Sequence, residues 1–199
     1  EEMDLSHGLP YAPQKMVIKA GDYDECNDAQ IVVITAGAAQ KPGQTRLELA
    51  ETNTKIMKQI TQNIMESGFN GIIIVASNPV DLMTYVVAEV SGLPKNKVIG
   101  SGTILDTARL RYLLADYLKV SSKNVHAYIM GEHGDSSFVP WEHAYVGCKK
   151  IKNIVKDSRR SMEDLNKIHE GVVNAAYEII KKKGATYYGI GMCLVRITN

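Results

Sequence analysis

One histidine of this chain lies in a short polar segment that could hold an imidazole for proton transfer. His133 is the third residue of GEHGDSS, residues 131–137, which directly follows the apolar run NVHAYIM. An imidazole titrates near neutral pH and can therefore give or take a proton in a reaction. Two alternatives stay open from this segment alone: a histidine that binds a metal ion, and an exposed histidine without a chemical role.

Asp106 and Arg109 form a second candidate group. They are three residues apart in TILDTARLRYLLADYL, residues 103–118, whose leucines are typical of a helix. Side chains at this spacing share one helical face, although an isolated Asp-x-x-Arg is more often an ordinary surface ion pair. Arg111 lies five residues after Asp106, about 140° around a helix with 3.6 residues per turn, so it faces elsewhere and needs a separate explanation.

Two loops carry further polar candidates. In AGAAQKPGQTRLELA, residues 36–50, the sequence Lys-Pro-Gly suits a mobile loop, and Gln40 and Arg46 flank it. An arginine near a helix N-terminus is mildly unfavourable with the helix dipole, which slightly favours a role facing an anion over simple solvation. In SNPVD, the Asn78 amide can both donate and accept hydrogen bonds, although Asn-Pro is also a common turn pair.

The elements that must position these residues alternate along the chain. Four continuous apolar runs predict strands covered on both faces, as in a parallel sheet: IVVITAGA, GIIIVASNP, NKVIGSGT and VHAYIMGEHG. A helical pattern follows each run, at residues 47–64, 79–92, 103–118 and 161–183. This alternation predicts a doubly wound α/β fold, whose ligands bind beyond the carboxyl ends of the strands.

Composition excludes several other classes of protein. The 199 residues are 45% hydrophobic and 23% charged, and a net charge of +1 gives no basic surplus for nucleic acid or an anionic membrane. The apolar runs fall far short of the roughly 20 residues of a transmembrane helix, and the N-terminus lacks a signal-peptide pattern. Three cysteines without a C-x-x-C pair, Cys26, Cys148 and Cys193, favour reduced thiols in a cytoplasmic protein, with neither disulfides nor a zinc site.

The organisation of the chain gives one boundary signal. Longer helices replace the short alternating units near residue 100, so we expect two parts, residues 1–100 and residues 101–199. The sequence starts without methionine and stops in the apolar segment LVRITN. We therefore expect a fragment that lacks both ends.

Five segments together resemble, in order, the signature blocks of the L-lactate and malate dehydrogenase family: ITAGAAQKPGQTR, ASNPVD, GSGTILDTARLR, IMGEHGDSS and GATYYGIG. The resemblance covers essentially the whole chain. It implies a Rossmann-type NAD-binding domain whose N-terminal strands are missing, followed by a mixed α/β substrate domain whose C-terminus is missing, in a cytoplasmic enzyme that is usually a homotetramer. The cofactor NAD is implied by the family alone, because GSGTIL and GIGMCL each lack the third glycine of a G-x-G-x-x-G phosphate loop.

The resemblance implies a role for each reactive residue. His133 resembles the catalytic acid/base, Asp106 its partner, Arg109 the clamp for the substrate carboxylate, and Arg46 the loop arginine that polarises the substrate carbonyl. A carboxylate beside a histidine favours the imidazolium, and an arginine can bind a carboxylate through two parallel hydrogen bonds. These residue types suit the reduction of a 2-oxo acid, and we expect no metal site.

Three further positions resemble substrate-site residues: Gln40, Asn78 and Thr186. Malate dehydrogenases are expected to carry arginine at the position of Gln40, because oxaloacetate brings a second carboxylate. A neutral Gln40 leaves that charge unpaired and tolerates the methyl group of pyruvate. We therefore expect reduction of pyruvate by NADH to L-lactate, the last step of fermentative glycolysis. A malate or other 2-hydroxy acid dehydrogenase, or a truncated inactive chain, is the alternative.

The resemblance also implies cofactor and regulatory positions. Residues expected around the dinucleotide are Tyr23, Gly37, Ala38, Ala76, Asn78 and Ser101. Arg111 and His126 match positions that resemble a fructose 1,6-bisphosphate site between the subunits of bacterial lactate dehydrogenases, where a bisphosphate would relieve the repulsion of two cations. The alternative is that Arg111 is simply a solvated helix residue and that His126 is a polar strand residue. Tyr177 matches a phosphorylated position of relatives, although a packed or half-exposed tyrosine explains it equally well.

Overall fold

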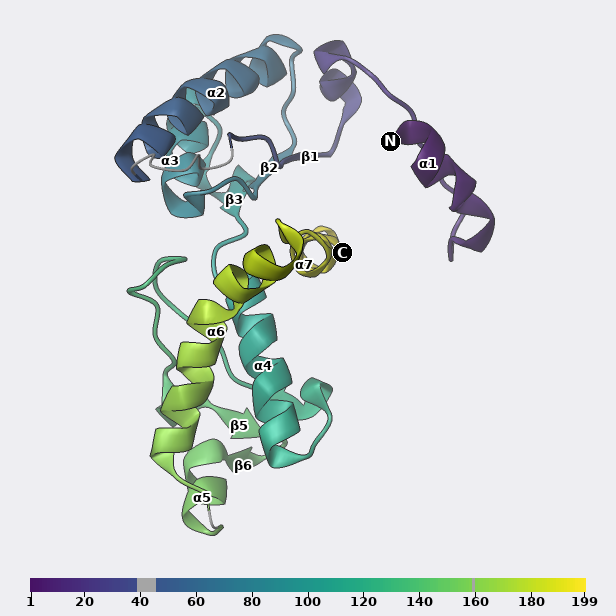
Figure 1. Ribbon diagram of the computed structural model, residues 1–199. Coiled ribbons are helices and arrows are strands. Elements are labelled where there is room, and N and C mark those ends of the chain that lie inside the picture. Colours follow the sequence, from purple (N-terminus) through teal and green to yellow (C-terminus); the bar gives the residue numbers. More distant parts are fainter. Residues whose placement is uncertain (39–45, 159) are drawn as a thin grey trace.

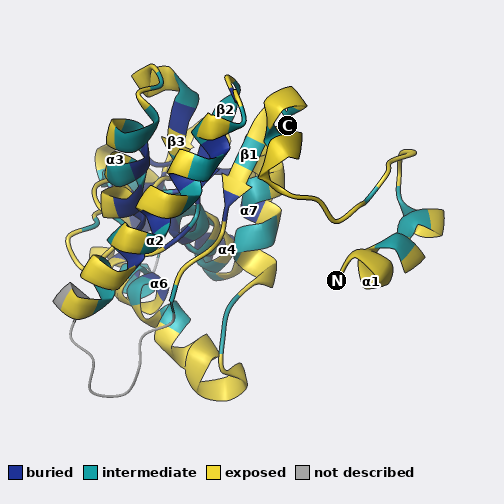
Figure 2. Cartoon of the chain, turned by 90° about the horizontal axis from the view of Figure 1, so that it is seen from above, coloured by how far each residue is buried: buried dark blue, intermediate teal, exposed yellow. Residues whose placement is uncertain are grey.

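The computed structural model describes residues 1–38, 46–158 and 160–199, with only the backbone of Arg46 and Leu47. The chain forms two packed parts, one above the other in Figure 1, with α7 lying between them. A short helix, α1 (Glu2–His7), and a one-turn helix, η1 (Leu9–Tyr11), precede them, and α1 stands apart from both parts in Figures 1 and 2.

The first part is a three-stranded parallel sheet with helical crossovers. Its strands β1 (Ile31–Ile34), β2 (Ile72–Val75) and β3 (Val98–Gly100) pair in the order β1-β2-β3, with Ile31 opposite Ile72 and Ile73 opposite Val98. Helices α2 (Arg46–Glu66) and α3 (Val80–Ser91) connect the strands and pack against each other. The predicted α/β fold with a parallel sheet is confirmed here, and η2 (Tyr23–Asp28) and η3 (Lys95–Lys97) complete this part.

The strands differ in how completely they are covered. Three consecutive residues of the central strand β2, Ile73 to Val75, are fully buried, as a strand between two covered faces requires. In β1, by contrast, Ile31 and Val33 are 37% and 38% exposed, while Ile34 is buried. The continuous apolar character of the sequence therefore predicted burial on both faces correctly for β2 but not for β1.

Two helices begin and end where their sequence signals predict. Pro79 directly precedes α3, and Gly92 ends it in the left-handed conformation, with φ of 63°. A capping box begins α6 (Met162–Lys183). The Ser161 hydroxyl accepts a hydrogen bond from the Asp164 backbone N–H, and the Asp164 carboxylate accepts one from the Ser161 backbone N–H. Gly184, with φ of 84°, follows the lysines of the last turn.

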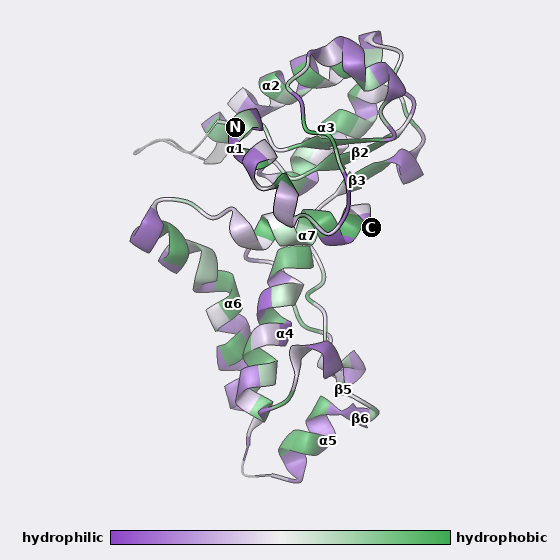
Figure 3. Ribbon diagram, turned by 90° about the vertical axis from the view of Figure 1, so that its right-hand side faces the viewer, coloured by the Kyte–Doolittle hydropathy of each residue, from purple (hydrophilic) through white to green (hydrophobic). Residues whose placement is uncertain are grey.

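The second part surrounds α4 (Ile104–Leu118), which follows β3 closely and packs against α6. A small antiparallel sheet, β4 (Val125–His126), β5 (Tyr145–Val146) and β6 (Lys149–Lys150), lies beside it with α5 (Ile151–Lys156), η4 (Ser122–Asn124) and η5 (Trp141–His143). The last helix, α7 (Tyr188–Thr198), is mostly hydrophobic in Figure 3 and contacts α4.

The expectation for the fourth apolar run was wrong. VHAYIMGEHG was expected to form a strand of the parallel sheet, but only Val125 and His126 are in a strand, and this strand is antiparallel to β5. The reason is visible in the burial, which alternates: Val125, Ala127 and Ile129 are buried, whereas the residues between them are exposed. One-sided burial is typical of antiparallel sheets, in which the other face meets solvent.

Each part has its own hydrophobic core. In the first, the sheet packs against α2 and α3 through residues such as Met57, Ile73 and Met83. In the second, α4, α6 and the 125–129 segment pack through residues such as Leu114 and Leu165. Figure 2 shows these buried residues on the strands and on the inward faces of the helices. Four of the candidate residues, Asn78, Asp106, Arg109 and His133, line one cavity where the two parts meet.

Candidate active site

The segment that carries His133 is a closed hairpin turn. Met130 and Phe138 form an isolated antiparallel bridge, with backbone N···O distances of 2.9 and 3.0 Å, and the Ser137 N–H donates to the Gly134 carbonyl at 3.2 Å. Gly131 has φ of 95°, a conformation that L side chains rarely adopt. The polar residues of this segment therefore form a defined turn at the edge of the second part.

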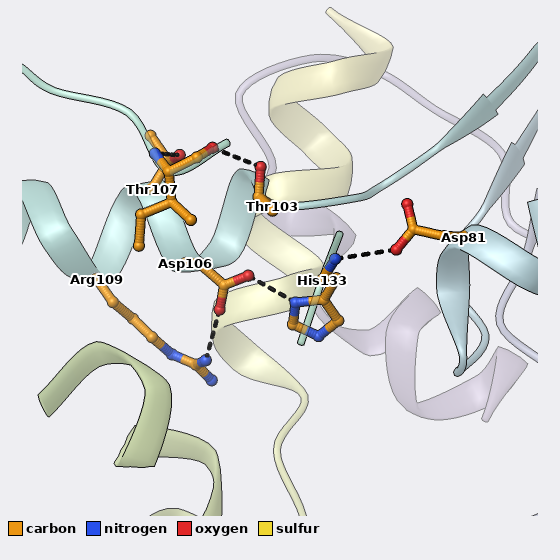
Figure 4. Close-up of polar contacts among 7 residues, drawn as sticks. Asp81, Thr103, Asp106, Thr107, Arg109 and His133 are labelled. Atoms are coloured by element: carbon orange, nitrogen blue, oxygen red, sulfur yellow. Dashed lines mark hydrogen bonds and ion pairs between the residues drawn. The ribbon is translucent and has the colours of Figure 1, made fainter. Parts of the chain in front are cut away.

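His133, Asp106 and Arg109 lie together, as Figure 4 shows. The Nδ1 atom of His133 is 2.6 Å from Oδ2 of Asp106, and the other carboxylate oxygen of Asp106 is 3.3 Å from the Arg109 guanidinium. The side chains of Asp106 and Arg109 are 10% and 14% exposed, compared with 29% for His133. A surface ion pair is thus excluded for Asp106 and Arg109, because both side chains are largely buried.

Two threonines fix α4 against the segment that leads to the histidine. The Thr103 hydroxyl donates to the Ile129 carbonyl at 2.7 Å, and the Thr107 hydroxyl accepts from the Ile129 N–H at 3.0 Å. Both threonines flank Asp106 on the first turns of α4, so these bonds set the distance between its carboxylate and the turn that begins at residue 131. The sequence analysis did not single out either threonine.

The surroundings of His133 favour its charged form. The hydrogen bond to Asp106 is the largest influence and raises the pKa of His133 above its usual 6.5. Partial burial and the positive charge of Arg109 oppose this increase, while the charges of Asp106 and Asp81 add to it. The imidazole can therefore hold a proton at neutral pH and release it to a neighbouring atom. Because Nδ1 contacts Asp106, the other ring nitrogen, Nε2, is the atom that would exchange a proton with a molecule bound in the cavity.

A cavity of about 560 Å³ surrounds this group. Asp106, Arg109, His133 and the turn after it line one side, and α6 contributes Val172, Val173, Ala176 and Tyr177. The first part of the chain contributes Leu49, Asn78 and Pro79. The cavity therefore combines an acid/base, a guanidinium and apolar walls, which suits a small organic acid that gains or loses a proton.

Asn53 is a site residue that the sequence analysis missed. Its buried amide accepts from the Ala38 N–H at 2.8 Å and donates to the Asn78 carbonyl at 2.8 Å. The Ser77 hydroxyl donates to the Ala36 carbonyl. These bonds tie the loop after β1 to the loop after β2. No local signal marks Asn53, since it lies in the middle of α2 and its partners are 15 and 25 residues away.

The expected cofactor positions gather at the carboxyl end of the parallel sheet. Gly37 and Ala38 follow β1, Ala76 and Asn78 follow β2, and Ser101 follows β3 with its N–H bonded to the Val75 carbonyl at 2.8 Å. Small residues leave the backbone after β1 exposed at Thr35 to Gly37. This surface fits an extended dinucleotide, which needs close approach to main-chain groups. Tyr23 is exposed in η2, away from the cavity lining.

Other candidates lie apart from the cavity or outside the described residues. Thr186 is half-buried between α6 and α7 and does not line the cavity. Arg111 faces away from Asp106, as its spacing predicted, and donates to the Ser122 carbonyl at 3.3 Å, while His126 is exposed on β4. Gln40 lies outside the described residues, as does the side chain of Arg46. Among the described residues, no three His, Cys, Asp or Glu side chains are grouped to hold a metal ion.

Two family models match the two parts of the chain. Residues 1–100 match the model described as lactate/malate dehydrogenase, NAD binding domain. Residues 103–199 match the model described as lactate/malate dehydrogenase, alpha/beta C-terminal domain. The chain therefore belongs to the lactate/malate dehydrogenase family.

Individual relatives agree with this assignment. L-lactate dehydrogenase 2 of Bacillus cereus is 57% identical over the whole chain, which spans 64% of the length of that protein. A lactate dehydrogenase from a Medee basin deep-sea metagenome library superposes with a TM-score of 0.96 at 58% identity, covering 99% of this chain and 63% of the other. The ligand-bound minor L-lactate dehydrogenase of Enterococcus mundtii also superposes with a TM-score of 0.96, at 50% identity, and the match covers 98% of this chain and 63% of the other. In the described part of the chain, no helix is both long and apolar enough to cross a membrane.

Proposed function

We propose that the protein containing this chain is an NAD-dependent L-lactate dehydrogenase, which reduces pyruvate to L-lactate and runs the reverse reaction. The observation that carries this proposal is the contact of His133 with Asp106, 2.6 Å long, beside the Arg109 guanidinium in one cavity. The 57% identity to L-lactate dehydrogenase 2 of Bacillus cereus supports the choice of substrate.

The chemistry of the residues follows from their positions. Arg109 binds the carboxylate of pyruvate and so fixes the orientation of its ketone. The ketone carbon would receive a hydride from NADH bound on the surface after β1, β2 and β3. His133, which Asp106 favours as the imidazolium, gives its proton to the ketone oxygen, and this oxygen becomes the hydroxyl group of lactate. Arg46, which begins α2, would stabilise negative charge as it develops on that oxygen. In the reverse direction, neutral His133 takes the hydroxyl proton.

We further propose that residues 1–100 bind NAD and that residues 101–199 belong to the substrate domain. The surface after β1, β2 and β3 would carry the dinucleotide, with Ala38 and Asn78 held in place by Asn53. Asn78 also lines the cavity, so the same loop would contact cofactor and substrate. Thr186 and Gln40 would complete the substrate site.

Gln40 provides the test between pyruvate and oxaloacetate. Initial rates of NADH oxidation should be measured with both substrates, side by side, on the full-length protein and on its Gln40→Arg variant. We expect the parent to prefer pyruvate and the variant to shift toward oxaloacetate, because an added guanidinium pairs the second carboxylate. A parent that prefers oxaloacetate would indicate a malate dehydrogenase instead. A protein that oxidises NADH with neither substrate would refute the proposed activity.

We also propose regulation by fructose 1,6-bisphosphate in a cytoplasmic homotetramer that acts at the end of fermentative glycolysis. Arg111 and His126 are the residues that would bind the two phosphates across a subunit interface. The test compares pyruvate saturation curves with and without the bisphosphate, for the parent and for Arg111→Gln. We expect the bisphosphate to lower the half-saturating pyruvate concentration of the parent alone. Identical curves for the parent would contradict this regulation and leave the catalytic proposal intact.

A further inference from the structure

Asp81 contacts the catalytic turn from the other part of the chain. Its carboxylate accepts a hydrogen bond from the His133 backbone N–H at 2.9 Å, although the two residues are 52 positions apart (Figure 4). His133 is thus held by two carboxylates from two helices. Asp106 of α4 holds the ring, whereas Asp81 of α3 holds the backbone.

The helix that carries Asp81 is a firm support. Val80, Met83 and Val87 of α3 are buried in the core under the parallel sheet. The loop before α3 is held as well, because the Asn78 carbonyl accepts from the buried Asn53 amide. The turn at residues 131–137, in contrast, is mostly exposed, and its backbone is held by the Met130–Phe138 bridge and by the Ser137–Gly134 hydrogen bond. The bond from this turn to α3 therefore connects an exposed element to a buried one.

We propose that Asp81 is a positioning residue that acts through His133, fixing the turn that carries the imidazole against the first turn of α3. It does not reach the reacting atoms itself, since its contact is with the backbone of His133. Through this contact the substrate-side histidine is placed relative to the loop of Asn78, on the part of the chain that carries the cofactor surface. This inference rests on the proposed function, which gives the position of His133 its importance.

The charge of Asp81 also influences the pKa of His133, which a hydrogen bond that only stabilises the fold would not do. The charged or titratable groups around His133 come from four elements: Asp106 and Arg109 on α4, Asp81 on α3, Glu132 and Asp135 on its own turn, and Tyr177 on α6. The Asp106 bond dominates the increase in the pKa of His133, and the negative charge of Asp81 adds to it. Removing that charge should lower the pKa of the imidazole.

The experiment uses the full-length protein and three variants. Asp81→Asn keeps an oxygen that can accept the His133 N–H but removes the charge. Asp81→Ala removes both. Glu89→Gln removes a negative charge from the far end of the same helix, where Glu89 is exposed, and serves as the matched control. Two readouts are needed: the pH dependence of kcat/KM for pyruvate reduction, and an NMR titration of labelled imidazoles, in which His133 is identified by the loss of its signal in His133→Gln.

We expect Asp81→Asn to lower the imidazole pKa and to move the alkaline limb of the rate profile to lower pH, with little change in the KM for pyruvate. Asp81→Ala should in addition lose about three- to tenfold in kcat, as the loss of one hydrogen bond implies. Glu89→Gln should match the parent in both readouts. An unchanged imidazole pKa and rate profile in Asp81→Asn, with an unchanged kcat in Asp81→Ala, would overturn the proposal, even if thermal stability fell.

The two proposals can fail separately. If the parent reduced no 2-oxo acid, the proposed function would fail, while the NMR titration would still decide whether Asp81 acts on His133. If Asp81→Ala did not fold, because a helix loses a favourable acidic residue in its first turn, Asp81→Asn alone would decide the matter. A normal imidazole pKa in a folded Asp81→Asn protein would then be the contradicting result.

Discussion

At the residue scale, Asp106 is a largely buried carboxylate that contacts two cationic partners. One oxygen bonds the imidazole of His133 and the other pairs with Arg109. A buried charge is costly unless it is paired and hydrogen-bonded, and here both oxygens are used. The same arrangement orients the ring and keeps a guanidinium nearby. Substitution of Asp106 should therefore affect both proton transfer and the stability of the fold, because it leaves Arg109 buried without its partner.

The first prediction concerns Asp106→Asn, which removes the largest cause of the raised pKa of His133. Pyruvate reduction needs the imidazolium, so its rate falls as pH rises through this pKa, and the variant should lose activity at a lower pH. We expect a loss of about 10²- to 10⁴-fold in kcat/KM near neutral pH, the usual contribution of an acid/base group. A profile of kcat/KM between pH 5 and 9 measures both effects. A variant whose alkaline limb coincides with that of the parent would contradict the role of Asp106.

The same group makes stability depend on pH. The pKa of His133 is higher in the folded than in the unfolded chain, so its contribution is complete below about pH 6.5 and is lost as pH rises through the folded pKa. The free energy of unfolding should decrease across this interval in the parent. In Asp106→Asn the decrease should be smaller.

Several site residues could be predicted from sequence, and others could not. His133, Asp106 and Arg109 were found because their types and local spacing match a recognisable chemistry, which the structure brings together in one cavity. Asn53 and Asp81 were missed because each acts through a backbone group far along the chain. A backbone partner leaves no trace in the pattern of side chains, so these contacts become visible only in the folded molecule.

At the scale of elements, one carboxylate, that of Asp164, both caps α6 and attaches it to α4. Asp164 closes the capping box with Ser161 and also accepts from the Tyr117 hydroxyl of α4 at 2.7 Å. These bonds, that of Tyr117 first, lower the pKa of Asp164. The cap therefore sets both the start of α6 and its attachment to α4, and both of these helices contribute residues to the cavity.

The second prediction tests this cap. Ser161→Ala removes the hydroxyl that accepts the Asp164 N–H, and we expect a loss of about 1 kcal/mol in the free energy of unfolding. Ser6→Ala is the control, since the Ser6 hydroxyl donates to the exposed carboxylate of Glu2 within α1 and caps no helix. Denaturant titration measures both variants. Equal stability of the two would show that the cap contributes nothing.

Elements with strong end signals were predicted well, and those defined by distant pairing were not. Pro79, Gly92, Ser161 and Gly184 fixed the limits of α3 and α6, because caps are local chemistry. The 125–130 segment was misassigned because its exposed positions hold Tyr128 and Met130, which are apolar in sequence but lie on the solvent side. Periodicity cannot separate such a strand from a fully buried one.

At the scale of the whole molecule, the site is shared between the two parts of the chain, each of which has its own hydrophobic core. Asn78 and Pro79 come from the first, and Asp106, Arg109 and His133 from the second. A ligand that contacts both sides binds only when the two parts are correctly placed. Ligand binding should therefore stabilise the arrangement of the two parts relative to each other.

The third prediction follows from this arrangement. NADH at about 100 times its dissociation constant should add about 2.7 kcal/mol to the stability of the full-length protein, which thermal unfolding can measure. NADPH at the same concentration should have a smaller effect. An unfolding temperature that neither nucleotide changes would contradict the assignment of residues 1–100 to cofactor binding.

The exposed face of β1 has a consequence for handling the protein. Ile31 and Val33 are more than a third exposed, and, within the described residues, β1 pairs only with β2. An apolar strand with a free edge offers its backbone to any strand of another molecule. In a preparation of this chain alone, that edge is where we expect aggregation to begin as concentration rises, and Val33→Lys is the simplest way to suppress it.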